Sequence, residues 1–191
     1  MNLPNKLSIL RVILVPFFVL VMVLPFEGAL DNWIRIIAAA VFILTALTDM
    51  LDGQIARRCN LVTDFGKFID PLADKFMVFG AMLGILYRFD YIRPVFIWAA
   101  LIVIFRELAI TSMRLIVVNK SGTVVAAAWL GKVKTVTQVV CIVTVLLNPV
   151  VLPQDKYYIL SYVTIFAMTA MTLWSGIDYM KAYWPLLDPN K

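Results

Sequence analysis

Histidine is absent from this chain of 191 residues, and cysteine occurs only twice. Histidine is the usual general base near neutral pH and a usual zinc ligand, so its absence excludes active sites with a histidine base and zinc sites with histidine ligands. Cys59 and Cys141 stand alone, without metal-binding spacing, and we interpret them as small buried or neutral residues. Any metal bound here therefore takes oxygen ligands, which favours Mg²⁺, Mn²⁺ or Ca²⁺.

Charge is also scarce, since 15% of the residues are charged and 62% are hydrophobic, with a mean hydropathy of +0.90. A soluble domain is about half apolar, so the composition indicates an integral membrane protein, and the length predicts one domain over residues 1–191. The apolar run after Arg11 continues past Phe26 with no cleavage site, so we expect no signal peptide. The net charge of +5 suits anionic substrates and does not by itself imply nucleic acid.

The hydropathy pattern predicts an all-α, polytopic protein without strands or low-complexity linkers. Turn residues divide it into six transmembrane helices, expected at about 7–26, 33–58, 63–88, 94–119, 126–148 and 157–182. Lysine and arginine gather at one set of helix ends, and the positive-inside rule places those ends and both termini in the cytoplasm. We therefore expect a multi-pass membrane protein with these ends in the cytoplasm.

Four carboxylates, Asp49, Asp52, Asp70 and Asp74, interrupt these apolar runs. A carboxylate at membrane depth is costly, so it is usually absent, paired or functional. Spacings of three and four residues put each pair on one helix face, and a tight connection makes the second and third helices antiparallel neighbours. The carboxylates then converge, and two divalent cations would compensate their charge and clamp a phosphoryl group.

The depth of the buried charges predicts a shared cavity. Counted from the outer charges Arg35, Arg88 and Arg93, the next deep charges are Asp49, Asp74 and Arg106, at 14, 14 and 13 residues. Each interval spans about 20 Å of helix. In a hydrocarbon core about 30 Å thick, this level lies about 10 Å inside the cytoplasmic boundary. We therefore expect a metal site between helices 2 and 3 in a cavity that faces the cytoplasm.

The stretch from Asp49 to Asp74 reads D-x2-D-G-x2-A-R-x8-G-x3-D-x3-D. This pattern resembles the signature of the CDP-alcohol phosphotransferase family at every fixed position. The resemblance implies a six-helix membrane enzyme, usually a homodimer, that moves a phosphoalcohol from a CDP-linked donor to a second alcohol and releases CMP. It also implies that the four aspartates surround two Mg²⁺ or Mn²⁺ ions and that Asp74 is the general base. The residues expected to lie along the CDP moiety are Asn5, Asp52, Gly53, Ala56, Arg57 and Gly66.

Three further segments, N-L-P-N-K-L-S-I-L-R, F-R-E-L-A-I-T-S-M-R and L-G-K-V-K-T-V-T-Q, resemble the bacterial branch of this family that uses glycerol 3-phosphate. Asn5 and Ser8 stand where that branch often has threonine, which preserves polarity. The resemblance implies CDP-diacylglycerol as donor and a place in the bacterial inner membrane. A phosphorylated acceptor brings about two negative charges and needs cations. The candidates for this acceptor-phosphate role are Arg106, Arg114, Lys132 and Lys134.

Alternatives stay open at this point. The acceptor could instead be inositol phosphate, serine or phosphatidylglycerol, with the same chemistry. Lys132 and Lys134 could snorkel toward lipid headgroups. A remote alternative is a divalent-cation channel or carrier, since carboxylate rings can select cations. Near the C-terminus, the aromatic residues Trp174, Tyr179, Tyr183 and Trp184 are typical of a belt at the membrane interface.

Overall fold

The computed structural model describes residues 3–58, 63–121, 129–152 and 158–184. These residues form six helices, namely α1 (Leu3–Val23), α2 (Gly28–Arg58), α3 (Asp64–Arg88), α4 (Arg93–Ser121), α5 (Trp129–Val151) and α6 (Ile159–Tyr183). No strand occurs in these ranges, so the all-α prediction is confirmed for them. Helix α5 continues to Val151, three residues past the expected end, and the Asn148 carbonyl accepts a hydrogen bond from the Leu152 amide at 2.9 Å.

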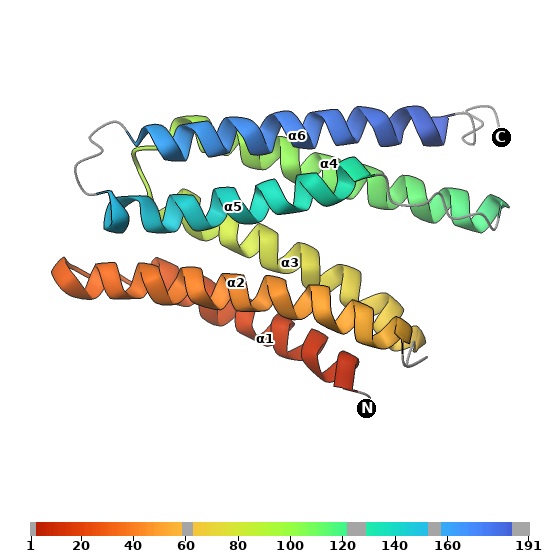
Figure 1. Cartoon of the computed structure of the whole chain (residues 1–191), viewed down its shortest axis with the longest axis horizontal. Helices are drawn as coiled ribbons and strands as arrows, with labels where there is room; N and C mark the ends of the chain where they lie inside the picture. Colours follow the sequence, from red (N-terminus) through yellow and green to blue (C-terminus); the bar gives the residue numbers. More distant parts are fainter. Residues whose placement is uncertain (1–2, 59–62, 122–128, 153–157, 185–191) are drawn as a thin grey trace.

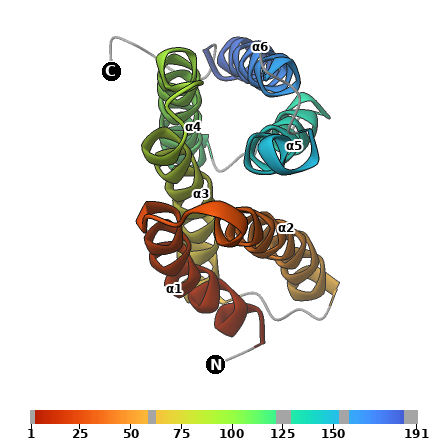
Figure 2. The same ribbon diagram turned by 90° about the vertical axis from the view of Figure 1, so that its left-hand side faces the viewer.

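The six helices form two groups around α3. Helix α1 packs on α3 and α2, while α6 packs on α5 and α4, and α2 meets α5 across the molecule. Both views place α3 between the α1–α2 pair and the other three helices (Figures 1 and 2). Helices α1, α3 and α5 begin, and α2, α4 and α6 end, at the same end of the bundle (Figure 1). We call this the site end.

Five of the helices are long and apolar enough to cross a membrane, by length and composition within the described ranges. Their outward faces carry large exposed apolar side chains, such as Phe166 at 77%, Phe105 at 73% and Trp98 at 68% exposure. Such faces suit lipid and not water. The chain is therefore a multi-pass membrane protein. Helix α3 is the exception, because it carries charged residues along its first half.

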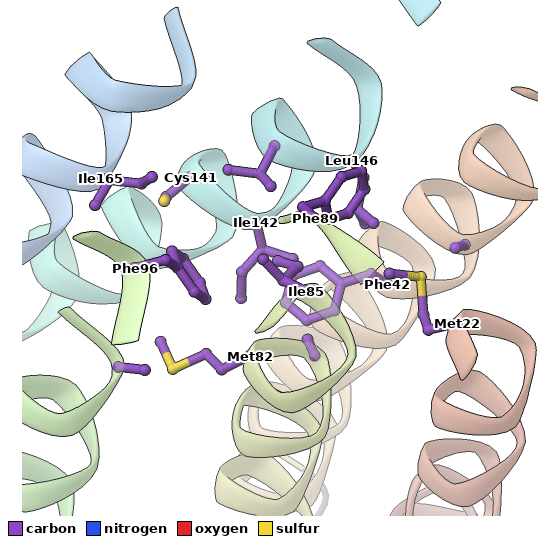
Figure 3. Packing of buried hydrophobic residues seen from close by; sticks show 14 of the residues in the cluster. Met22, Phe42, Met82, Ile85, Phe89, Phe96, Cys141, Ile142, Leu146 and Ile165 are labelled. Atoms are coloured by element: carbon purple, nitrogen blue, oxygen red, sulfur yellow. The ribbon is translucent and has the colours of Figure 1, made fainter. Parts of the chain in front are cut away.

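The core cluster takes side chains from all six helices. Among them, Phe42 of α2, Ile85 of α3 and Ile142 of α5 point toward one another (Figure 3). Because lipid is as apolar as these side chains, close packing rather than the hydrophobic effect holds such helices together. Gly80 and Gly84 let α1 approach α3 closely.

At the end of the bundle opposite the site end, two arginines link α1, α2 and α3 through ion pairs and hydrogen bonds. Arg88 of α3 and Arg35 of α2 both pair with Asp31, and the Arg35 Nε lies 2.6 Å from the carboxylate. Arg88 Nη1 also donates to the carbonyls of Met22 at 2.9 Å and Leu24 at 3.1 Å. These carbonyls belong to the end of α1, where no intrahelical donor remains for them. Arg88 thus fixes α1, α2 and α3 to one another.

Tyr91 lies in the turn between α3 and α4 and connects this turn to the start of α6. Its ring stacks on Tyr158 with the centroids 3.7 Å apart, and its carbonyl accepts from the Tyr162 hydroxyl at 2.8 Å. Burial raises the pKa of Tyr91 to about 12, so the phenol stays neutral at physiological pH. The contact sets α4 beside α6.

Candidate active site

The third helix carries two of the predicted aspartates one turn apart. It starts after Thr63, whose hydroxyl caps the helix by accepting the Gly66 amide at 3.0 Å. Asp70 is half-buried and Asp74 is exposed. Because their spacing is four residues, both carboxylates point to the same side of α3.

Two polar residues of α1 contact the predicted aspartates, and neither was among the residues that we expected in the site from the sequence. Ser8 donates its hydroxyl proton to Asp70, and Arg11 forms an ion pair with Asp49 of α2. Arg11 Nη2 also lies 3.4 Å from the Ser8 hydroxyl. The signal was present in the sequence, because Asn5, Ser8 and Arg11 recur every three residues in α1, whose only other polar residue is Lys6.

Asn5 and Gly66 are explained in the first place by packing between α1 and α3. Asn5 is buried, and its amide nitrogen donates to the Thr63 hydroxyl at 3.0 Å. A Cβ on Gly66 would lie 2.9 Å from the Asn5 Oδ1 and 3.2 Å from the Thr63 Oγ1, so only glycine fits there without a shift. Their expected contact with the donor stays a prediction.

The remaining donor-site predictions fall on the last turns of α2. The backbone of α2 is helical to Arg58. The side chains of Asp52, Ala56 and Arg57 and the surroundings of Gly53 lie outside what the structure describes. Helical periodicity puts Asp52 on the face of Asp49.

A second cluster, from α4 and α5, contains two of the four cations predicted for the acceptor phosphate. Glu107 pairs with Lys134 and lies 3.3 Å from Arg106. The side chains of Arg106, Glu107 and Lys134 are 11%, 13% and 6% exposed, so the three charges are nearly buried. The cluster lies on α4 and α5, and both of these helices contact α3, which carries Asp70 and Asp74.

Arg114 and Lys132, the other two predicted cations, behave differently. Both side chains are exposed, and neither forms an ion pair with another residue in the described ranges. They lie near the site end, on the last turns of α4 and the first turn of α5.

The chemistry of the aspartates fits a hard divalent cation. Within the described residues no group of three or more His, Cys, Asp or Glu side chains is close enough to hold a metal ion, and the Asp52 side chain is outside that set. The donors on α2 and α3 are carboxylate oxygens, the ligands that Mg²⁺ and Mn²⁺ prefer. The Asp49 side chain is 39% exposed and Asp74 is exposed, so an ion and a substrate can reach both.

Of the four aromatic residues assigned to an interfacial belt, two do not belong to it. Trp174 and Trp184 are 63% and 65% exposed, as a belt requires, but Tyr179 and Tyr183 are 4% and 1% exposed. The belt prediction is wrong for Tyr179 and Tyr183, because the face of α6 that carries them packs against α4 and α5.

The comparisons with known proteins agree with the motif. Residues 1–175 match the family model described as CDP-alcohol phosphatidyltransferase. The chain therefore belongs to this family.

Among individual relatives, a protein of Bacillus subtilis (strain 168) is 40% identical over 99% of this chain and 98% of its own length. A Yersinia enterocolitica protein is 35% identical over 99% of both chains, and a Pseudomonas fluorescens protein is 34% identical over all of this chain and 94% of its own length. All three are named CDP-diacylglycerol--glycerol-3-phosphate 3-phosphatidyltransferase.

Proposed function

We propose that this protein transfers the phosphatidyl group from CDP-diacylglycerol to glycerol 3-phosphate, giving phosphatidylglycerophosphate and CMP. The observation that carries this proposal is the nearly buried cluster of Arg106, Glu107 and Lys134 on α4 and α5, both of which contact the aspartate-bearing α3. A buried pair of cations beside a catalytic carboxylate suits an acceptor that has both a phosphate and a reactive hydroxyl. The names of the full-length relatives support the same acceptor.

The proposed donor lies partly in the membrane and partly in the site. Its acyl chains lie in lipid against the exposed apolar faces of the helices, and its CDP head enters the site end between α2 and α3. The residues proposed to line the head are Asn5, Asp52, Gly53, Ala56, Arg57 and Gly66. The small ones keep side-chain bulk away from the ligand.

Asp49, Asp52, Asp70 and Asp74 would hold two divalent ions, Mg²⁺ or Mn²⁺. Such ions, when bound, polarise the pyrophosphate and neutralise charge on the attacking and leaving oxygens. Ser8 and Arg11 orient two of these carboxylates.

Asp74 accepts the proton of the C1 hydroxyl of glycerol 3-phosphate. The hydroxyl oxygen forms a bond to the phosphorus that carries diacylglycerol. The bond from that phosphorus to the bridging oxygen breaks, and this oxygen leaves with CMP. Arg106 and Lys134 bind the acceptor phosphate, with the exposed Arg114 and Lys132 at the entrance.

The proposal includes the membrane placement and assembly. Helix α3 is the sixth span, since it too exposes large apolar side chains, such as Phe68 at 69% and Leu83 at 58%, and the metal site between α2 and α3 opens to the cytoplasm. The whole chain acts as one domain, and two copies form a homodimer.

One assay tests the acceptor. The purified protein in mixed micelles receives CDP-diacylglycerol and Mg²⁺ with glycerol 3-phosphate, inositol phosphate, serine or phosphatidylglycerol, and CMP release is measured. We expect release with glycerol 3-phosphate at a rate far above that with the other three. Faster release with another acceptor would contradict the acceptor assignment while preserving the reaction type. Cation flux into proteoliposomes that lack the donor would instead support a channel.

A further inference from the structure

We propose that Tyr179 of α6 is a positioning residue for Arg106, and that through this contact α6 sets the affinity for the phosphate of the acceptor. The inference rests on the proposed function, because it takes Arg106 as a phosphate-binding group.

The two side chains face each other inside the protein. Arg106 Cζ lies 5.3 Å from the centroid of the Tyr179 ring, and Tyr179 is only 4% exposed. A guanidinium at this distance from an aromatic face is attracted by the ring quadrupole. Tyr183 stacks against Tyr179 with the centroids 6.1 Å apart and an interplanar angle of 11°, so the ring itself is held in place.

Two glycines leave room for this arrangement. A Cβ on Gly176, one turn before Tyr179, would lie 3.2 Å from Cγ of Arg106. A Cβ on Gly131 of α5 would lie 3.0 Å from the Tyr179 hydroxyl oxygen and 3.3 Å from its Cε2. All three distances are shorter than ordinary van der Waals contacts, so a larger residue at Gly131 or Gly176 displaces the side chain of Tyr179 or Arg106.

The chemistry of the ring explains its use here. Glu107 also contacts Arg106, at 3.3 Å, but a carboxylate neutralises the charge that it holds. The tyrosine ring is neutral and occupies one face of the guanidinium, so it fixes the cation and leaves its charge for a ligand. The Nε of Arg106 has no hydrogen-bond partner among the residues described, although it is buried. A donor in this state suits a phosphate oxygen.

The first test separates affinity from turnover. Tyr179→Leu removes the aromatic face, and we expect the KM for glycerol 3-phosphate to rise about fivefold while kcat and the Mg²⁺ dependence stay within about twofold. Tyr179→Phe keeps the face and restores the KM of the unchanged protein. Trp174→Leu is the matched control, because Trp174 is an exposed aromatic of the same helix. A Tyr179→Leu variant with an unchanged KM, or with a loss confined to kcat, would overturn the inference.

The second test does not depend on removing the ring. Gly131→Ala pushes on the tyrosine hydroxyl, so it raises the KM, and Tyr179→Phe in the same chain relieves most of that effect because the closest clashing atom is gone. Independent, additive effects would contradict the proposed contact. Arg106→Ala separates the phosphate-binding role of Arg106 from the positioning role of Tyr179. If it leaves the KM unchanged, the phosphate assignment and this inference both fail, whereas a raised KM beside an unaffected Tyr179→Leu removes only the role of Tyr179.

Discussion

Arg11 of α1 forms an ion pair with Asp49 of α2, and its own side chain is only 3% exposed. Helix α1 therefore does more than cover the bundle. Through Arg11 and Ser8 it contacts carboxylates on both helices of the motif, although it contributes no aspartate itself. Replacement of a group that orients a metal ligand typically costs about 10-fold to 100-fold in metal affinity or activity.

Replacement of Arg11 by methionine is expected to lower phosphatidyl transfer by about 10-fold to 100-fold, because Asp49 loses its fixed orientation. The measurement is the rate of CMP release as a function of Mg²⁺ concentration. Lys6→Met is the control, since Lys6 is an exposed cation of the same helix. Tighter Mg²⁺ binding with full activity would show that Arg11 acts only as a repelling charge.

Asp74→Asn is expected to lower kcat by at least about 10³-fold, because the amide cannot accept the proton of the acceptor hydroxyl and is a poorer metal ligand. The variant should still be produced and elute as the unchanged protein does. Asp90→Asn serves as the matched control, because the Asp90 side chain is 83% exposed at the other end of the bundle. Near-normal turnover in Asp74→Asn would exclude Asp74 as the base.

Removal of divalent ions should abolish transfer, and added Mg²⁺ or Mn²⁺ should restore it. Equilibrium dialysis with Mn²⁺ is expected to give about two bound ions per chain, since four carboxylates can share two cations. Asp70→Asn should reduce the number or the affinity of these ions. A protein that keeps full activity after chelation, with no bound metal by elemental analysis, would contradict the metal assignment.

Arg88→Met is expected to destabilise the protein by about 3 kcal/mol, because it leaves Asp31 with one cation fewer in a buried cluster and the end of α1 without its donor. Thermal unfolding in detergent, followed by tryptophan fluorescence, measures the change. Lys181→Met should shift the transition little, since the Lys181 side chain is exposed. Equal losses in the two variants would contradict the role given to Arg88.

The fold could be predicted largely from the sequence because its signal is local. Long apolar runs and the turn residues between them indicate helices wherever they occur, and the six helices lie close to the expected ranges. The exceptions have local causes. Helix α1 begins at Leu3, before the expected start, since Pro4 is tolerated in a first turn where no amide partner is needed.

The site could be predicted only in part, because its contacts join distant segments. The spacing of Asp70 and Asp74 is enough to put both on one face of α3, whereas the cavity expected to join them to Arg106 stays a prediction. The roles of Arg11 and Tyr179 depend on which helices pack together, and no local pattern specifies that. Tyr179 looked like an interfacial residue from its place in the sequence, and its burial follows from α4 and α5, which cover it.

The exposed apolar faces have a consequence for kinetics. A protein with side chains such as Phe105 and Phe166 in contact with lipid meets its donor by diffusion within the membrane plane, whereas glycerol 3-phosphate arrives from water. The rate then follows the mole fraction of CDP-diacylglycerol in the membrane or micelle and not its bulk concentration. Dilution of the donor with inert detergent at constant total amount should slow the reaction as an inhibitor would, although nothing has bound to the protein.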